Sequence, residues 1–325
     1  MGLLRRTFGR ITGRAMGRTV GRTVGTAALG FGASGLLLRR WAANPHPQGG
    51  PPKFPAGRVI TVPTDDGAEI AVEISGEDGP PVVLVHGITN SHDDWGYVAE
   101  RLVTAGHHVY GVDQRGHGAS SVGADGFSAP RLGADVAAVL RRFDLRDCVL
   151  AGHSMGGIAA LSFAVDHPDE LSARVKALVL VSTLPRGDRV DQRLGSRSFR
   201  LDWTLAQRVP LIGRLVAGLV VFGTPKSLDM IDDVLDSAQR MSRENRIAAA
   251  EGLLSYNVVD RLNDIAVPTT VACGTADLVT PNAWSRAIAA AIPGAARVEW
   301  SQTGHQSIWE RVDEIADIIA DRARA

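Results

Sequence analysis

Cysteine and lysine are scarce in this 325-residue sequence, and acidic residues are absent from its first 50 positions. Its two cysteines, Cys148 and Cys273, cannot form a disulfide scaffold, and no cysteine–histidine cluster has the spacing of a zinc site. Residues 1–50 contain eight arginines, which leaves 27 basic and 35 acidic residues for the rest of the chain. Because this remaining part is acidic, we expect no nucleic acid as a partner.

The composition is that of a globular protein with a sizeable core. It is 45% hydrophobic and 22% charged, with 36 glycines and 16 prolines, which excludes a disordered tail protein, collagen and a coiled coil. The chain is long enough to fold without disulfides or metals. No motif in the sequence predicts a metal or a cofactor.

Residues 1–43 form a basic and apolar segment that we expect to associate with a membrane. Glycine and arginine recur every fourth residue from Gly9 onward, which aligns the arginines along a helix, where they can meet lipid phosphates. The 16 residues Thr23–Leu38 carry no charge and would span about 24 Å as a helix. The alternatives are an export signal, for which Arg5-Arg6 resembles a twin-arginine start, and a basic tail on a cytoplasmic protein.

A segment rich in proline and glycine follows at 44–57. It contains five prolines in 14 residues, which is typical of a stiff and extended linker. We therefore expect the folded core to begin near Arg58. It would comprise residues 58–184 and 266–325, with an insertion at 185–265.

Apolar runs of strand length alternate with helical segments along this core. The first two runs flank a turn and predict an antiparallel hairpin, and the third, Pro81–Val85, is an unbroken apolar run, as in a strand buried on both faces of a parallel sheet. The eight runs are Val59–Val62, Glu69–Ile74, Pro81–Val85, His108–Val112, Cys148–Ala151, Val175–Val181, Thr269–Cys273 and Arg297–Trp300. The alternation predicts an α/β fold with a doubly wound, mostly parallel, eight-stranded sheet.

One long stretch interrupts the alternation. No strand is predicted within 185–265, so we expect a helical cap inserted between strands six and seven, over the strand ends where α/β sheets bind ligands. Within it, Val209–Phe222 contains one charge in 14 residues. As a helix, this stretch would have to be buried or face lipid.

The sequence Gly152-His153-Ser154-Met155-Gly156 lies between an apolar strand and a helix. A serine that acts as a nucleophile must project from a sharp turn, and small residues two positions away on each side let the strand and the helix pass. We predict Ser154 as the nucleophile and the Met155 amide as an oxyanion donor. The alternative is a glycine-rich turn whose serine has no catalytic role.

Only two histidines follow Ser154 in the chain. His167 precedes a proline at a helix end, whereas His305 lies in the loop after the last strand, so we predict His305 as the general base. Asp277 is the carboxylate in the loop after the strand that ends at Cys273, and we predict it to orient His305. Its alternative role is that of a turn or capping residue.

The second oxyanion donor is expected in the loop after the third strand. There, His86-Gly87-Ile88 follows Val85. Gly87 permits a tight turn, and the Ile88 amide is the predicted donor. His86 and His153 are expected to support the site rather than to react.

Five motifs together resemble the α/β-hydrolase superfamily, and within it the serine esterases and monoglyceride lipases. They are Leu84-Val85-His86-Gly87, Asp113-Gln114-Arg115-Gly116-His117-Gly118, Gly152-His153-Ser154-Met155-Gly156, Gly274-Thr275-Ala276-Asp277 and Gly304-His305. The resemblance extends from about Arg58 to Arg322. It implies the same triad and oxyanion amides, and a structural role for the Arg115–His117 loop. It excludes relatives with an aspartate nucleophile, because Ser154 occupies that place.

The predicted function is that of a serine esterase or lipase, which cleaves small or lipid-like carboxylic esters through an acyl-enzyme intermediate. Such an enzyme would need an ester substrate and no cofactor, and residues 1–43 would bring it to the membrane. The alternatives are a cofactor-free haloperoxidase or perhydrolase on the same triad, a carbon–carbon bond hydrolase, and a non-catalytic, membrane-tethered binding protein.

Overall fold

The computed structural model describes residues 35–187, 210–223 and 227–325 of the chain. The expectations for residues 1–34 fall outside this part, as do those for residues 188–209 and 224–226 of the cap. Among the helices that are described, none is both long enough and apolar enough to cross a membrane.

One sheet of eight strands forms the centre of the molecule, in the order β1-β2-β4-β3-β5-β6-β7-β8. The strands are β1 (Arg58–Pro63), β2 (Glu69–Ser75), β3 (Pro81–Val85), β4 (His108–Val112), β5 (Cys148–His153), β6 (Val175–Val181), β7 (Thr269–Gly274) and β8 (Ala296–Trp300). The β1–β2 and β2–β4 pairs are antiparallel, and all other neighbours are parallel. The predicted sheet, with its hairpin at one edge, is confirmed.

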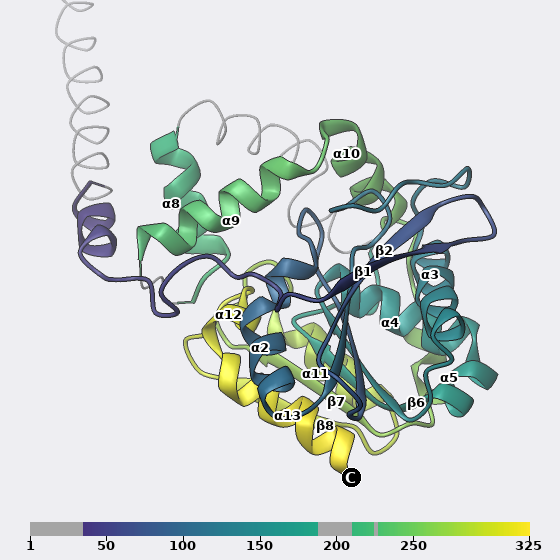
Figure 1. Cartoon of the computed structure of the whole chain (residues 1–325). Helices are drawn as coiled ribbons and strands as arrows, with labels where there is room; N and C mark the ends of the chain where they lie inside the picture. Colours follow the sequence, from purple (N-terminus) through teal and green to yellow (C-terminus); the bar gives the residue numbers. More distant parts are fainter. Residues whose placement is uncertain (1–34, 188–209, 224–226) are drawn as a thin grey trace, which may run out of the picture.

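Helices cover both faces of the sheet (Figure 1). α2 and α13 pack on one face, and α3, α4, α5 and α11 pack on the other. The elements around the sheet are η1 (His92–Trp95), α2 (Gly96–Thr104), α3 (Ala129–Arg142), α4 (Met155–Asp166), α5 (Pro168–Arg174), α11 (Asn282–Ala291), α12 (Ser307–Glu310) and α13 (Val312–Arg324). α3 begins directly after Ser128, whose side chain accepts a hydrogen bond from the Arg131 amide and so caps the helix.

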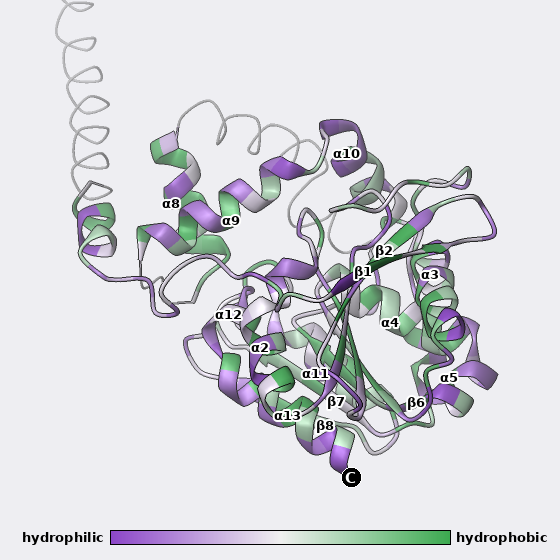
Figure 2. Ribbon diagram, viewed as in Figure 1, coloured by the Kyte–Doolittle hydropathy of each residue, from purple (hydrophilic) through white to green (hydrophobic). Residues whose placement is uncertain are grey.

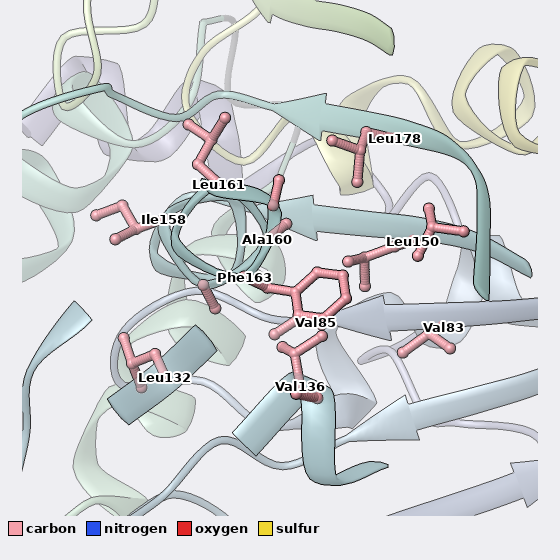
Figure 3. Close-up of a cluster of buried hydrophobic side chains, with 14 of the residues drawn as sticks. Val83, Val85, Leu132, Val136, Leu150, Ile158, Ala160, Leu161, Phe163 and Leu178 are labelled. Carbon is pink, nitrogen blue, oxygen red and sulfur yellow. The ribbon is translucent and has the colours of Figure 1, made fainter. Parts of the chain in front are cut away.

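Side chains of the inner strands alternate between two hydrophobic clusters. In β3, Val83 and Val85 contact the cluster of α3 and α4, whereas Val82 and Leu84 contact that of α2 and α13. Figure 3 shows the first cluster, in which Phe163 of α4 lies over the sheet beside α3. Because both faces are buried, these strands are hydrophobic throughout, and Figure 2 shows this as green along the central strands.

A helical cap lies between β6 and β7. In the described residues it contains α8 (Pro210–Val220), α9 (Leu228–Arg240), α10 (Arg243–Gly252) and the short η2 (Val259–Asp264), and no strand. This composition agrees with the predicted helical insertion.

The α8 helix buries Gly213, Ala217 and Gly218 and leaves three of its large apolar side chains exposed. Gly218 lies against Trp41, from the helical turn at 35–42, and against Ile231 of α9. The exposed apolar side chains of α8 are those of Leu211, Val216 and Leu219, which are 40%, 44% and 50% exposed. The stretch that sequence analysis expected to be buried or to face lipid therefore presents an apolar face away from the core.

Residues 44–57, which the proline content predicts to be a linker, lie against the core. Phe54 is buried, and its ring meets the ring of His92 edge-on at 5.4 Å between centroids. The Phe54 amide donates a hydrogen bond to Asp93 Oδ1 at 2.9 Å. The packed body of the protein therefore starts before β1.

We predict that Phe54→Ala lowers the free energy of unfolding by about 3 kcal/mol, because it empties a buried aromatic site. Urea unfolding would measure the loss, with Leu36→Ala as the control at a position that is 72% exposed. A loss no larger than that of the control would show that residues 44–57 contribute nothing to stability, as a true linker would.

Candidate active site

Ser154 occupies the turn between β5 and α4 with a backbone φ of 53° and ψ of −116°. Residues with a β-carbon rarely adopt a positive φ, so this turn is strained. A β-carbon on Gly152 would lie 2.3 Å from the Gly156 carbonyl oxygen, and one on Gly156 would lie 2.0 Å from that of Val85. Glycine is therefore required at both positions, because the turn presses against the end of β3.

The predicted nucleophile, base and acid lie in one hydrogen-bonded row. His305 Nε2 is 3.0 Å from Ser154 Oγ, and His305 Nδ1 is 3.0 Å from Asp277 Oδ2. Asp277 follows β7 and His305 follows β8, so three separate loops supply the row. All three residues are buried, with Ser154 and His305 still 7% and 8% exposed.

Asp277 is held by the turn that follows it. The amides of Val279 and Thr280 donate to its Oδ1 at 2.9 and 2.7 Å, and the Thr280 hydroxyl donates to Oδ2 at 2.7 Å. Burial by itself would raise the pKa of Asp277, but the charge and hydrogen bond of His305, together with the bonds from Thr280, outweigh burial and lower it. The carboxylate therefore stays ionised at neutral pH.

Sequence analysis missed Thr280. The sequence does contain a signal for it. An aspartate often accepts hydrogen bonds from the backbone two or three residues further on, and Asp277-Leu278-Val279-Thr280 has that spacing. It also missed Thr183, whose hydroxyl donates to the Ser154 carbonyl oxygen at 2.8 Å. No local pattern marks Thr183, because the contact joins residues 29 positions apart.

The backbone on each side of His305 is held by a hydrogen bond. The Gly304 amide donates to Glu310 Oε1 at 2.8 Å, and the Gln306 amide donates to the Val221 carbonyl oxygen at 3.0 Å. Val221 directly follows α8, so the end of a cap helix lies on the loop that carries His305.

The predicted oxyanion loop, residues 86–90 after β3, lies beside Ser154. A β-carbon on Gly87 would be 3.2 Å from the Ser154 β-carbon. Within the described chain, no acceptor is bonded to the Ile88 or Met155 amide. Met155 opens α4, and the first amides of a helix have no partner within it. Two free N–H groups therefore flank the serine.

His86 and His153 are buried and hold backbone groups of the site. His86 Nδ1 donates to the Gly87 carbonyl oxygen at 2.7 Å, and its Nε2 accepts from the Gln114 amide at 3.0 Å. His153 Nε2 donates to the His305 carbonyl oxygen at 2.9 Å. Burial, reinforced by a neighbouring histidine in each case, lowers the pKa of both to about 3. Both rings are therefore neutral at physiological pH, and both hold the backbone of the site through hydrogen bonds.

A buried carboxyl, which sequence analysis did not single out, joins the two loops. Asp94 Oδ2 accepts hydrogen bonds from Asn90, in the oxyanion loop, and from Gln306, next to His305. Burial raises the pKa of Asp94 to about 7, although both hydrogen bonds act in the opposite direction. The oxyanion loop and the His305 loop thus share one support.

His92, which follows the oxyanion loop in the chain, lies between two carboxylates. Its amide and its Nδ1 both lie 2.8 Å from Asp113 Oδ1, and its Nε2 lies 2.9 Å from Glu73 Oε2. Burial alone would lower the pKa of His92, but the hydrogen bond and charge of Asp113, with the charges of Asp93 and Glu73, raise it to about 9. His92 is therefore a cation held between two strands at neutral pH.

Comparison with known proteins places the chain in a family. It belongs to the alpha/beta hydrolase fold family, whose model matches residues 80–312. The AB hydrolase superfamily protein YisY of Bacillus subtilis (strain 168) is 26% identical over 265 residues, which cover 80% of this chain and 97% of that protein. A non-heme haloperoxidase of Rhodococcus erythropolis is 29% identical over 252 residues, covering 73% and 89%.

A solved structure, an esterase from Exiguobacterium antarcticum, matches with a TM-score of 0.74 and 23% identity, covering 83% of this chain and 100% of its own. At this identity the likeness shows the fold. The relatives include both esterases and haloperoxidases, so the family membership establishes an α/β hydrolase but not the bond that it cleaves.

We predict that His92 stabilises the fold most strongly below pH 6.5 and that this contribution is lost as the pH rises through about 9. Between these values the folded protein keeps the proton that the unfolded chain has released, so the free energy of unfolding falls with rising pH. Urea unfolding of the wild type and of His92→Gln from about pH 6 to about pH 10 measures the effect. The gap in stability between the two proteins should narrow with pH, and a constant gap would contradict the assignment.

Proposed function

We propose that this protein is a serine hydrolase that cleaves carboxylic esters through an acyl-enzyme intermediate. The observation that carries the proposal is the row Ser154–His305–Asp277, with 3.0 Å between each pair of partners, beside two unpaired amides. A nucleophile in reach of a base, and a base oriented by a third group, is the arrangement that activates a serine.

In the first step, Ser154 Oγ attacks the ester carbonyl carbon and His305 Nε2 accepts the hydroxyl proton. Asp277 accepts a hydrogen bond from His305 Nδ1, which leaves the lone pair on Nε2 free to take that proton. Because the pKa of Asp277 is lowered, its charge is present to stabilise the imidazolium that forms. The proton then passes to the leaving alcohol.

The negative charge that develops on the carbonyl oxygen needs donors that are already in place. The amides of Ile88 and Met155 would supply them, one from the loop after β3 and the other from the start of α4. The Met155 amide also lies at the positive end of the helix dipole, which favours an anion.

In the second step, water attacks the acyl-enzyme while His305 accepts its proton, and the acid leaves as Ser154 regains its proton. Hydrogen peroxide at this step would give a peracid instead. That second candidate function is supported by the Rhodococcus relative, whose name is that of a non-heme haloperoxidase. Comparing ester hydrolysis with peroxide-dependent bromination by the same preparation separates the two candidates.

We expect Ser154→Ala to reduce hydrolysis of p-nitrophenyl acetate by about 10³-fold or more and to abolish labelling by a fluorophosphonate. Ser301→Ala, an exposed serine in the loop before His305, is the matched control and should leave both signals unchanged. Near-normal turnover in a folded Ser154→Ala protein would refute the nucleophile assignment.

We expect Asp277→Asn to slow turnover by up to about 10⁴-fold with little change in KM, because the amide holds the wrong histidine tautomer. Asp264→Asn, an exposed aspartate before β7, serves as the control. Full activity of Asp277→Asn would mean that another carboxylate orients His305.

A further inference from the structure

The oxyanion loop contains a backbone conformation that its sequence does not favour. Thr89, directly after Ile88, has a φ of 65°. A positive φ is an outlier for a β-branched residue, because its side chain crowds the backbone. Such strain persists only where surrounding contacts impose it, and it gathers at functional sites.

The contact that holds Thr89 in this conformation comes from His117. The Thr89 amide donates to His117 Nε2 at 3.1 Å, and His117 Nδ1 lies 2.9 Å from the carbonyl oxygen of Arg115. A carbonyl oxygen can only accept, so the ring proton is on Nδ1 and Nε2 keeps its lone pair for the amide. His117 is 1% exposed, and burial lowers its pKa, so the ring stays neutral.

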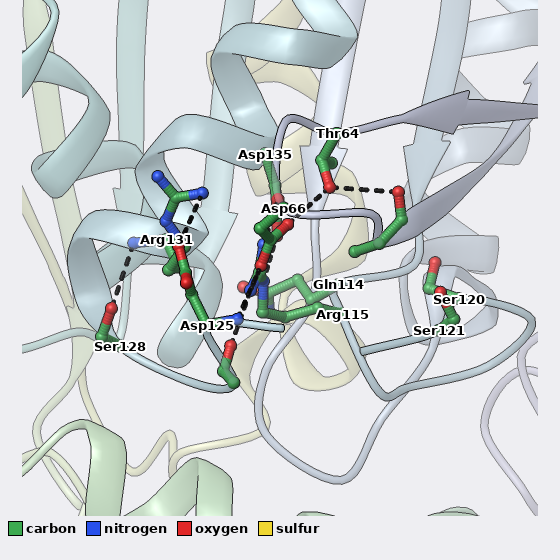
Figure 4. Close-up of polar contacts among 12 residues, drawn as sticks. Thr64, Asp66, Gln114, Arg115, Ser120, Ser121, Asp125, Ser128, Arg131 and Asp135 are labelled. Carbon is green, nitrogen blue, oxygen red and sulfur yellow. Dashed lines mark hydrogen bonds and ion pairs between the residues drawn. The ribbon is translucent and has the colours of Figure 1, made fainter. Parts of the chain in front are cut away.

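The position of His117 is fixed by a buried ion cluster (Figure 4). Arg115 Nε and Nη2 each donate to one oxygen of Asp135 at 2.7 Å, and Nη1 donates to Asp66 Oδ2 at 3.0 Å. The Arg115 side chain is fully buried. A bidentate ion pair of this kind fixes the orientation of the guanidinium group as well as its distance from the carboxylate. The carbonyl oxygen that orients His117 therefore belongs to one of the most firmly held residues of the fold.

We propose that His117 is a positioning residue for the oxyanion loop, holding Thr89 in its strained conformation so that the preceding Ile88 amide stays beside Ser154. The inference rests on the proposed function, because an oxyanion donor matters only if Ser154 attacks a carbonyl group. It concerns the bond from His117 Nε2 to the Thr89 amide, not the bulk of the ring.

The packing of the His117 ring accounts for less of its proposed role than its bond to the Thr89 amide does. The ring also contacts His86, with 5.1 Å between centroids, and Phe127, at 6.5 Å. A purely apolar ring could satisfy both contacts. It could not accept from the Thr89 amide, which would then be left unpaired at the edge of the buried site.

Two substitutions of His117 separate the bond from the packing. Glutamine can place an oxygen where Nε2 lies and accept from Thr89, whereas asparagine is too short to do so but can still donate to Arg115. We expect His117→Asn to lower the kcat for p-nitrophenyl acetate by about tenfold to a hundredfold with KM nearly unchanged. We expect His117→Gln to stay within about threefold of the wild type.

A rescue variant tests the strain itself. Glycine adopts a positive φ without steric cost, so Thr89→Gly should remove much of the dependence on His117. We expect Thr89→Gly in the His117→Asn background to restore most of the lost kcat. A substitution that had merely weakened the fold would not be rescued by adding a glycine.

A second readout reports on the oxyanion donors directly. A boronic acid forms a tetrahedral adduct with an activated serine, so its affinity depends on those donors more than the KM of a substrate does. We expect His117→Asn to weaken inhibition by a phenylboronic acid in proportion to its loss of kcat. Thermal unfolding of every variant would show that the comparison is made among folded proteins.

The outcomes distinguish the two proposals. If fluorophosphonate fails to label the wild type, the proposed function is wrong. If the wild type is labelled but His117→Asn is as active as the wild type, only the role of His117 is overturned. If His117→Asn does not fold, the test rests on His117→Gln. A folded His117→Gln protein that loses about a hundredfold in kcat, although it retains the hydrogen-bond acceptor, would contradict the proposal.

Discussion

The geometry of the site depends on one constraint, the common direction of the parallel strands. β3, β5, β7 and β8 all end at the same edge of the sheet, so the loops that follow them meet there. Those loops carry Ile88, Ser154, Asp277 and His305, which are separated by as many as 217 positions in the chain. No local interaction could bring such distant residues within hydrogen-bond distance, and the hydrophobic layers on both faces of the sheet stabilise the arrangement that does so.

Buried polar side chains are bonded to the strained backbone beside the row Ser154–His305–Asp277. Ser154 and Thr89 both have positive φ angles, and each is bonded to a buried side chain, Thr183 and His117 respectively. His86 and His117 are neutral, because burial lowers their pKa values, so each can donate from one ring nitrogen and accept at the other. A charged residue could not do both. This explains why histidine, rather than lysine or arginine, occurs next to the site.

The sheet and the row Ser154–His305–Asp277 could be predicted from the sequence because both depend on order along the chain. Runs of strand length identify the strands, and Ser154, Asp277 and His305 each lie in a loop or turn that follows one of them. The supports could not be predicted in this way, since the bond between His117 and Thr89 exists only once Thr89 adopts a positive φ. The sequence of 44–57 is uninformative for a related reason. Its prolines predict an extended linker, but composition gives no information on whether the segment lies against the core, and the burial of Phe54 shows that it does.

The contact between the cap and the His305 loop limits how this enzyme could evolve. The Gln306 amide donates to the Val221 carbonyl oxygen, just beyond α8, so the end of a cap helix is bonded to the residue next to His305. Caps are the part of such a fold that can change length and sequence when selectivity changes. Here an exchange of the cap that alters the residues after α8 would also move His305. Variation in selectivity is therefore most easily accommodated in the parts of the cap furthest from Val221.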